Sequence, residues 1–181
     1  MKKFELTGNF KMYFGRKLFQ IRALVSIKDV VEAGETGGYI EKEENLDQTG
    51  DAWVSGDAWV SGNAWVSGDA QVSGNALVSG NARVSGNARV SGDAQVYGDA
   101  QVSGNADVLQ ITGLGTVHRT TMVYKTKDGI EIVCGCFRGG IEAFKAQVVN
   151  TRSGKVRNEY LKFAELIEIY FGIKQEERES E

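Results

Sequence analysis

The chain has 181 residues, of which 41% are hydrophobic and 25% charged, and its net charge at neutral pH is −3. This length allows one or two domains, and the weak negative charge argues against the basic footprint of a nucleic-acid-binding protein. No apolar run approaches the roughly 20 residues of a membrane span, so neither nucleic acid nor membrane is an expected partner. Proline is absent, which suits a chain whose backbone N–H groups mostly pair between strands.

Residues 1–37 are predicted to form a β-rich N-terminal cap. Residues 3–6 and 10–14 are rich in apolar side chains, Gly15-Arg16 is typical of a turn, and residues 18–25 alternate between apolar and polar. This pattern predicts a β-hairpin or small meander. The stretch from Gly34 to Gly38 is interpreted as a flexible turn that follows it.

The segment after the cap carries an imperfect repeat. Ile40 and Leu46 are six residues apart, whereas the step from Leu46 to Val54 is eight. Tyr39–Thr49 is therefore predicted to form a leading coil, with two residues inserted before a regular array begins.

Residues 50–109 are ten copies of a six-residue unit, Gly-[Asp/Asn]-Ala-x-Val-Ser, with variation at the last position. In an extended segment, residues two apart face the same side, so Ala and Val point inward and the variable residue points outward. Gly with Asp or Asn tolerates positive φ and makes a corner. The hydrophobic residues recur every six residues, and this spacing does not shift at the turns. Such constancy predicts a continuous coil and not a hairpin meander. Thr112 and Leu114 keep the spacing, which extends the predicted coil to residue 116.

This unit resembles the hexapeptide repeat of left-handed parallel β-helices. The resemblance implies a mainly β fold in which residues 38–116 form the helix, with three hexads per coil, so that residues 18 apart lie in one column. An exposed solenoid end needs a cap, which residues 1–37 supply. Proteins of this kind commonly form trimers around a threefold axis, so the resemblance also implies a homotrimer.

Residues 117–173 are predicted to form a ββαα module. Thr120–Lys125 and Ile130–Phe137 have the composition of strands around a Thr126–Gly129 turn, and apolar residues recur at helical spacing over 141–150 and 156–172. Residues 174–181 are predicted to be a disordered acidic tail.

Both flanks of the repeat also resemble a group of hexapeptide-repeat proteins encoded by bacteriophages and prophages. The similarity rests on Ile21-Arg-Ala-Leu24, on Gly37-Gly-Tyr-Ile-Glu41 before the repeat, and on Tyr124-Lys-Thr-Lys-Asp-Gly129 and Cys134-Gly-Cys-Phe137 after it. The resemblance implies a phage accessory protein. A start without the apolar core of a signal peptide and cysteines suited to a reducing compartment lead us to expect a cytoplasmic location.

Catalytic and metal chemistry find little support in the sequence. Many hexapeptide-repeat proteins are acyltransferases that use a histidine base, and this alternative stays open. However, the one histidine, His118, lies outside the regular hexads, and no loop interrupts residues 50–109. Cys134 and Cys136 would need two further ligands to bind a metal. We therefore expect no enzyme activity, cofactor or metal.

The binding candidates are coil residues that depart from the regular repeat, together with basic residues that follow the coil. One tryptophan falls on each face of the first coil, a collar that would contact the cap, another subunit or a ligand. Two arginines lie on neighbouring faces of the coil, and a third precedes Gly139-Gly140 at the start of a predicted helix, where anions bind. The full set of candidates is Trp53, Trp59, Trp65, Arg83, Arg89, His118, Arg119 and Arg138.

These observations favour a non-enzymatic, phage-encoded binding protein. The hypothesis is that it counters bacterial antiviral defence by binding a host protein or by sequestering a small anionic ligand such as a nucleotide. A hexapeptide-repeat acyltransferase and a structural or virion component are the alternatives.

Overall fold

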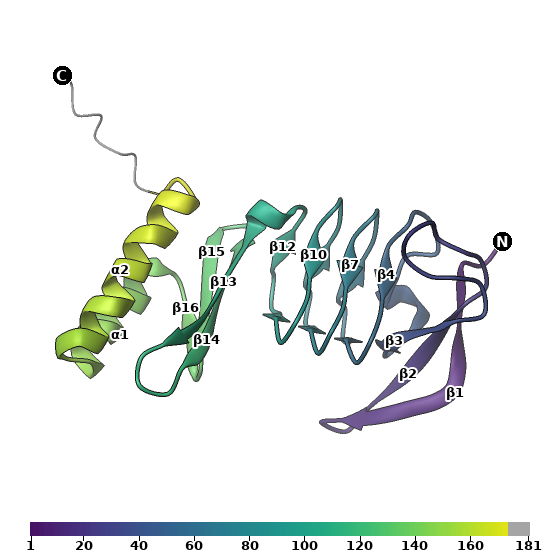
Figure 1. Ribbon diagram of the computed structural model, residues 1–181, viewed down its shortest axis with the longest axis horizontal. Helices are drawn as coiled ribbons and strands as arrows, with labels where there is room; N and C mark the ends of the chain where they lie inside the picture. Colours follow the sequence, from purple (N-terminus) through teal and green to yellow (C-terminus); the bar gives the residue numbers. More distant parts are fainter. Residues whose placement is uncertain (174–181) are drawn as a thin grey trace, which may run out of the picture. The chain divides into compact units, whose positions relative to one another are not determined.

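The computed structural model describes residues 1–173, which fall into two compact units (Figure 1). The first unit comprises Met1–Ala106 and the second begins at Asp107. The predicted acidic tail, residues 174–181, lies outside the described residues. No helix in the described part of the chain is long and apolar enough to cross a bilayer.

The N-terminal cap is a β-hairpin, as the sequence predicts. Strand β1 (Phe4–Tyr13) pairs antiparallel with β2 (Arg16–Ala23), and the register shifts between Leu6 and Phe10. The two turn residues Phe14 and Gly15 have φ of 44° and 77°, which matches the tight hairpin turns whose twist suits paired strands.

Strand β3 (Thr36–Ile40) joins the hairpin to the coil. It pairs antiparallel with β2 and parallel with β5 (Trp59–Val60). The prediction of a flexible turn was therefore wrong for Gly37 and Gly38, which are buried inside this strand. A Cβ at Gly37 would lie 2.5 Å from the carbonyl oxygen of Val54, so glycine is needed here for close backbone approach.

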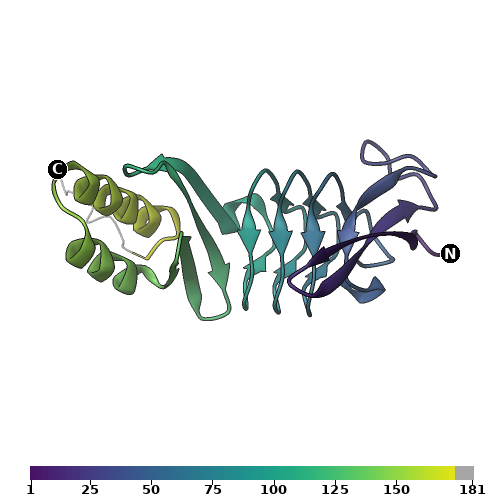
Figure 2. The ribbon, with the colours of Figure 1, turned by 90° about the horizontal axis from the view of Figure 1, so that it is seen from below.

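The hexads form a β-solenoid, which confirms the predicted architecture; its left-handedness stays a prediction. Its remaining strands are β4 (Trp53–Val54), β6 (Trp65–Val66), β7 (Gln71–Val72), β8 (Leu77–Val78), β9 (Arg83–Val84), β10 (Arg89–Val90), β11 (Gln95–Val96) and β12 (Gln101–Val102). They stack into three parallel sheets, β4-β7-β10, β6-β9-β12 and β5-β8-β11, and the last is continuous with β3, β2 and β1. Figure 2 shows the strands of successive coils side by side.

The register confirms both predicted spacings. Val54 pairs with Val72 and Val60 with Val78, residues 18 apart. In the leading coil Ile40 pairs with Val60, and Leu46 with Val66, residues 20 apart. The two inserted residues are therefore taken up before the regular array starts.

Small apolar residues fill the coil, and amides stack at its corners. The inward Ala and Val residues between Ala52 and Val102 are at most 2% exposed. On one corner Asn63 Nδ2 donates to Asn81 Oδ1 at 3.2 Å, and Asn81 Nδ2 donates to Asp99 Oδ1 at 3.1 Å. On this corner, neighbouring coils are thus linked by side-chain as well as backbone hydrogen bonds.

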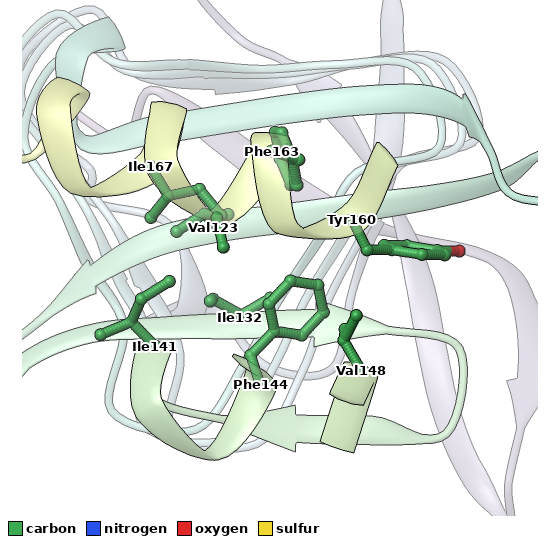
Figure 3. Packing of buried hydrophobic residues seen from close by; sticks show 9 residues of the cluster. Val123, Ile132, Ile141, Phe144, Val148, Tyr160, Phe163 and Ile167 are labelled. Carbon is green, nitrogen blue, oxygen red and sulfur yellow. The ribbon is translucent and has the colours of Figure 1, made fainter. Parts of the chain in front are cut away.

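The second unit is a four-stranded antiparallel sheet with two helices. The strands are β13 (Val108–Leu114), β14 (Arg119–Thr126), β15 (Gly129–Cys134) and β16 (Phe137–Gly139); the helices are α1 (Ile141–Thr151) and α2 (Gly154–Tyr170). Phe144, Tyr160, Phe163 and Ile167 pack with Val123 and Ile132 in its core (Figure 3). Both predicted helices are confirmed.

The boundary between the units lies earlier than the spacing of hexads predicts. Val108–Leu114 pairs antiparallel with β14 and does not form a last coil. A short 3₁₀ turn, Asn105–Asp107, precedes it, and Lys125 Nζ lies 2.6 Å from Asp107 Oδ1. Alternation of side chains is the same in a coil strand and in an antiparallel strand, so the spacing of Thr112 and Leu114 could not distinguish them.

Candidate functional site

The three tryptophans do not form an exposed ring. Trp53 is only 2% exposed, beneath β3, and Trp59 is half-buried under the edge of the Tyr13 ring, with centroids 4.3 Å apart. Trp65 is 39% exposed. The cap therefore covers two members of the predicted collar, and only Trp65 offers an accessible ring.

A cleft of about 300 Å³ opens where the hairpin turn meets two stacked corners of the coil. Figure 2 shows the β1–β2 hairpin running beside the first coils. The turn supplies two aromatic rings and a guanidinium, and the corners supply hydroxyls, amides and glycine backbone. The lining residues are Tyr13, Phe14, Arg16, Ser61, Gly62, Asn63, Ser79, Gly80 and Asn81.

Ionic contacts hold the hairpin turn over the corner. Arg16 Nη1 lies 2.8 Å from Glu41 Oε2, and the same oxygen accepts the Gly62 N–H at 2.6 Å. Farther along the hairpin, Lys11 Nζ lies 2.6 Å from Asp57 Oδ1. The Gly62 N–H, followed by Arg16, holds the pKa of Glu41 below its ordinary value because both favour the ionised carboxylate.

The turn presents an aromatic side chain to solvent. Phe14 is 89% exposed, and its ring centroid lies 4.5 Å from that of Tyr13. Its φ of 44° is uncommon for an aromatic residue. The result is a large apolar ring at the mouth of an otherwise polar cleft.

The next face of the coil carries a column of three different side chains. Trp65, Arg83 and Gln101 stack because β6 pairs with β9 and β9 with β12. The Arg83 guanidinium carbon lies 5.9 Å from the centroid of the Trp65 ring, within the range of a cation–π interaction. Within residues 1–173 its guanidinium forms no ion pair, so its charge is not neutralised locally.

We call the cleft and this column together the aromatic edge, defined by six residues. Asn63 links its two parts, because it lines the cleft and precedes Trp65 by two residues in the same hexad. Stacking, hydrogen bonding and charge pairing are therefore all available at one corner of the coil and on the face that follows it. The six are Tyr13, Phe14, Asn63, Trp65, Asn81 and Arg83.

Arg89 lies elsewhere on the coil. It belongs to the sheet β4-β7-β10, above Gln71, and its backbone N–H donates to Asn105 Oδ1 at 3.0 Å. Arg83 and Arg89 are equivalent in their hexads but face different sides, so the fold does not bring them together.

The other candidates lie in the second unit. His118 is exposed at φ 48°, and its Nδ1 lies 3.4 Å from the Gly113 carbonyl oxygen. Arg119 is the first residue of β14, and its side chain falls outside the described part of the structure. Arg138 forms an ion pair with Glu131, Nη2 to Oε2 at 3.1 Å, so its charge is already matched beside Gly140.

The part of the chain that the structure describes contains no assembled metal site. No group of three or more His, Cys, Asp or Glu side chains there could hold a metal ion. The aromatic edge combines rings, a guanidinium, amides and hydroxyls, groups that can stack on a ligand and hydrogen-bond to it.

Sequence reasoning finds Trp65 and Arg83 but not the hairpin residues of this site. The sequence places Phe14 at the end of an apolar strand and predicts a turn at Gly15-Arg16, but no local signal indicates that this turn lies over Asn63 and Asn81. The pairing of β2 with β3, and of β3 with β5, decides that placement.

Comparison with known protein families supports the assignment of the hexads to a β-solenoid. The model of the YdcK β-solenoid repeat family matches residues 70–85 and 82–98. The matched stretches lie within the solenoid and include Arg83 and Arg89, but not the hairpin or the second unit. No curated protein matches the chain.

Proposed function

We propose that this protein is a non-catalytic binding protein that captures a small anionic ligand of the nucleotide type at the aromatic edge. One observation carries the proposal. The unneutralised guanidinium of Arg83 lies over the exposed ring of Trp65, beside a cleft lined by amides and hydroxyls.

A nucleotide matches these groups because it joins a planar base to a phosphate. Aromatic side chains stack on bases at about 1–3 kcal/mol per base, and Trp65 and Phe14 both have accessible rings. Arginine pairs with phosphate oxygens through its planar fork of donors. Asn63 and Asn81 add amide groups within the cleft.

The biological setting is part of the same proposal. The resemblance of both flanks to phage and prophage proteins supports a phage accessory protein that works in the cytoplasm of a bacterial host. Sequestering a nucleotide signal would then counter an antiviral response. A homotrimer is the assembly that the hexapeptide repeat supports, and capture of a host protein is the competing mode of action.

The test is isothermal titration calorimetry of the full chain with AMP, ATP, a cyclic dinucleotide and uncharged adenosine. We expect at least one phosphorylated ligand to bind at least ten times more tightly than adenosine. Arg83→Gln should weaken that binding about tenfold or more, as expected for loss of a charge-assisted contact.

Arg89→Gln is the matched control. It removes the same charge from the equivalent position of the next hexad, on a face where Gln71 and not a tryptophan lies below. Gln already occupies this position in several hexads, so both variants should fold. Equal weakening by the two variants, or equal affinity for adenosine and AMP, would contradict a site at the aromatic edge.

A further inference from the structure

The second unit contains a cavity of about 240 Å³ that is separate from the aromatic edge. Its apolar wall is formed by Phe137, Phe144 and Val148. Figure 3 shows Val148 and Phe144 near Tyr160, whose hydroxyl points away from the rest of the cluster. The cavity thus lies beside large aromatic side chains at the margin of this core.

Cys134 and Cys136 also line this cavity. The β15–β16 turn, Gly135-Cys136, has a φ of 60° at its glycine. Thr121 Oγ1 donates to Cys134 Sγ at 3.1 Å, so one thiol already has a hydrogen-bond partner. Cys136 is exposed, and its thiol can report on occupancy of the cavity.

Arg152 places a positive charge at the same cavity. It follows α1 as its C-cap residue, and its guanidinium reaches only the Thr151 carbonyl oxygen, at 3.4 Å. No carboxylate pairs with it in the described chain. An exposed arginine at this place would ordinarily neutralise the carbonyls that a helix leaves unpaired at its C-terminus.

Arg157 already performs that task. Its Nε donates to the Arg152 carbonyl oxygen at 2.7 Å, and its Nη2 donates to the Val149 carbonyl oxygen at 2.9 Å. The end of α1 is therefore satisfied without the side chain of Arg152. The guanidinium of Arg152 remains available to a ligand, next to the apolar wall.

A second, more polar cavity of about 330 Å³ meets the first at Arg152. It is lined by Thr116, Ser153 and Val156 and shares Thr151, Arg152 and Tyr160 with its neighbour. Arg152 thus lies at the boundary between an apolar space and a space lined by hydroxyls. This division matches a molecule with an apolar body and a charged head.

We infer that the second unit binds a small monocarboxylate with an apolar body. The carboxylate would pair with Arg152, and the apolar body would lie against Phe137, Phe144 and Val148. An apolar cavity of about 150 Å³ holds benzene, so the space here suits a substituted aromatic ring or a short acyl chain. Bidentate pairing with a guanidinium selects a carboxylate over an alcohol of the same shape.

The experiment titrates the full chain with phenylacetate and hexanoate and, as uncharged counterparts, with 2-phenylethanol and hexanol. We expect a carboxylate to bind at least ten times more tightly than its alcohol. Arg152→Gln should remove this preference, and Lys155→Gln, which deletes a charge from the first turn of α2 outside both cavities, should leave it unchanged.

Alkylation of Cys136 provides a second measurement on the unaltered chain. Saturating phenylacetate or hexanoate should slow its reaction with iodoacetamide severalfold, followed by intact mass. Equal affinity for alcohol and carboxylate, an unchanged preference in Arg152→Gln, or absence of both binding heat and protection would overturn the inference. Nucleotide binding at the aromatic edge does not bear on this result, so the two proposals fail separately.

Discussion

The solenoid and the second unit build their cores from different kinds of side chain, small in the solenoid and large and aromatic in the second unit. In the solenoid, each coil buries the same Ala and Val, and each interior position has an equivalent one coil away. In the second unit, Phe144, Tyr160 and Phe163 pack with aliphatic residues of the sheet, and each occupies a unique environment. In the repeated core one packing arrangement is copied from coil to coil, whereas the varied core of the second unit has a cavity of about 240 Å³ at its margin.

The comparison also explains where the candidate sites lie. On the solenoid, the candidate site lies where the hairpin turn meets the Asn63 corner, so that non-repeating residues lie against regular hexads. In the second unit, the cavities form between elements of unlike geometry, a β-turn and the end of a helix.

The largest expected effect breaks the irregular core. Phe144→Ala should destabilise the second unit by about 3–5 kcal/mol, because it removes a buried ring and leaves a cavity. Urea unfolding followed by circular dichroism at helix wavelengths reports on this unit, which contains α1 and α2. All three tryptophans lie in the first unit, so their fluorescence reports on the solenoid.

The control for this variant is Val149→Ala, on the same helix, where the side chain is 46% exposed. It should change stability little. A shift of the tryptophan transition without a shift of the helical transition in Phe144→Ala would contradict the division into two cores.

A smaller effect tests whether stacking, and not only backbone conformation, requires glycine at the corners. Gly74 and Gly92 have φ of 69° and 66°, but a Cβ at Gly74 would lie 2.9 Å from the Gly92 nitrogen, whereas a Cβ at Gly92 meets nothing within 4 Å. Gly92→Ala should cost about 1–2 kcal/mol for the left-handed conformation alone. Gly74→Ala should cost about 1–3 kcal/mol more, because the stacked backbone must shift.

Tryptophan fluorescence during urea unfolding measures both glycine variants. Equal costs would show that the corners need glycine only for its φ, and that neighbouring coils yield freely.

The smallest effect concerns the hairpin that completes the aromatic edge. The pKa of Glu41 is lowered from its ordinary value of 4.5 in the folded protein, so the unfolded chain takes up this proton first as pH falls. The stabilisation is therefore complete above pH 4.5 and declines as pH drops toward the lowered folded pKa. At about 0.2–1 kcal/mol for a partly exposed pair, Glu41→Gln should reduce stability at pH 6, and its cost should shrink as the pH falls below 4.5.

Glu44→Gln is the control, because Glu44 is exposed in the same segment and its side chain forms no hydrogen bond or ion pair within residues 1–173. Its effect should be small at both pH values. A Glu41→Gln penalty that persists unchanged at pH 3 would show that the hairpin is held by packing alone.

Local patterns predict much of this fold. Apolar residues 10–14, a Gly15-Arg16 turn and alternation over residues 18–25 predict the hairpin. The hexads predict the solenoid and its register, and helical spacing predicts α1 and α2. The same reasoning fails at Gly37-Gly38 and at Val108–Leu114, where a glycine pair and an alternating strand each suit two structures. For the candidate site, it finds Trp65 and Arg83 and misses Phe14, whose position depends on strands paired far along the chain.

The sequence by itself therefore determined the repeating coil, because the φ preference of each glycine and the burial of each Ala and Val act within six residues and recur. Only the tertiary structure decided that Trp53 and Trp59 are covered while Trp65 is not, that the hairpin turn lies over Asn63 and Asn81, and that Arg152 is left beside a cavity. The hairpin, for example, contacts the coil through Lys11 with Asp57 and Arg16 with Glu41, between residues that no local pattern connects.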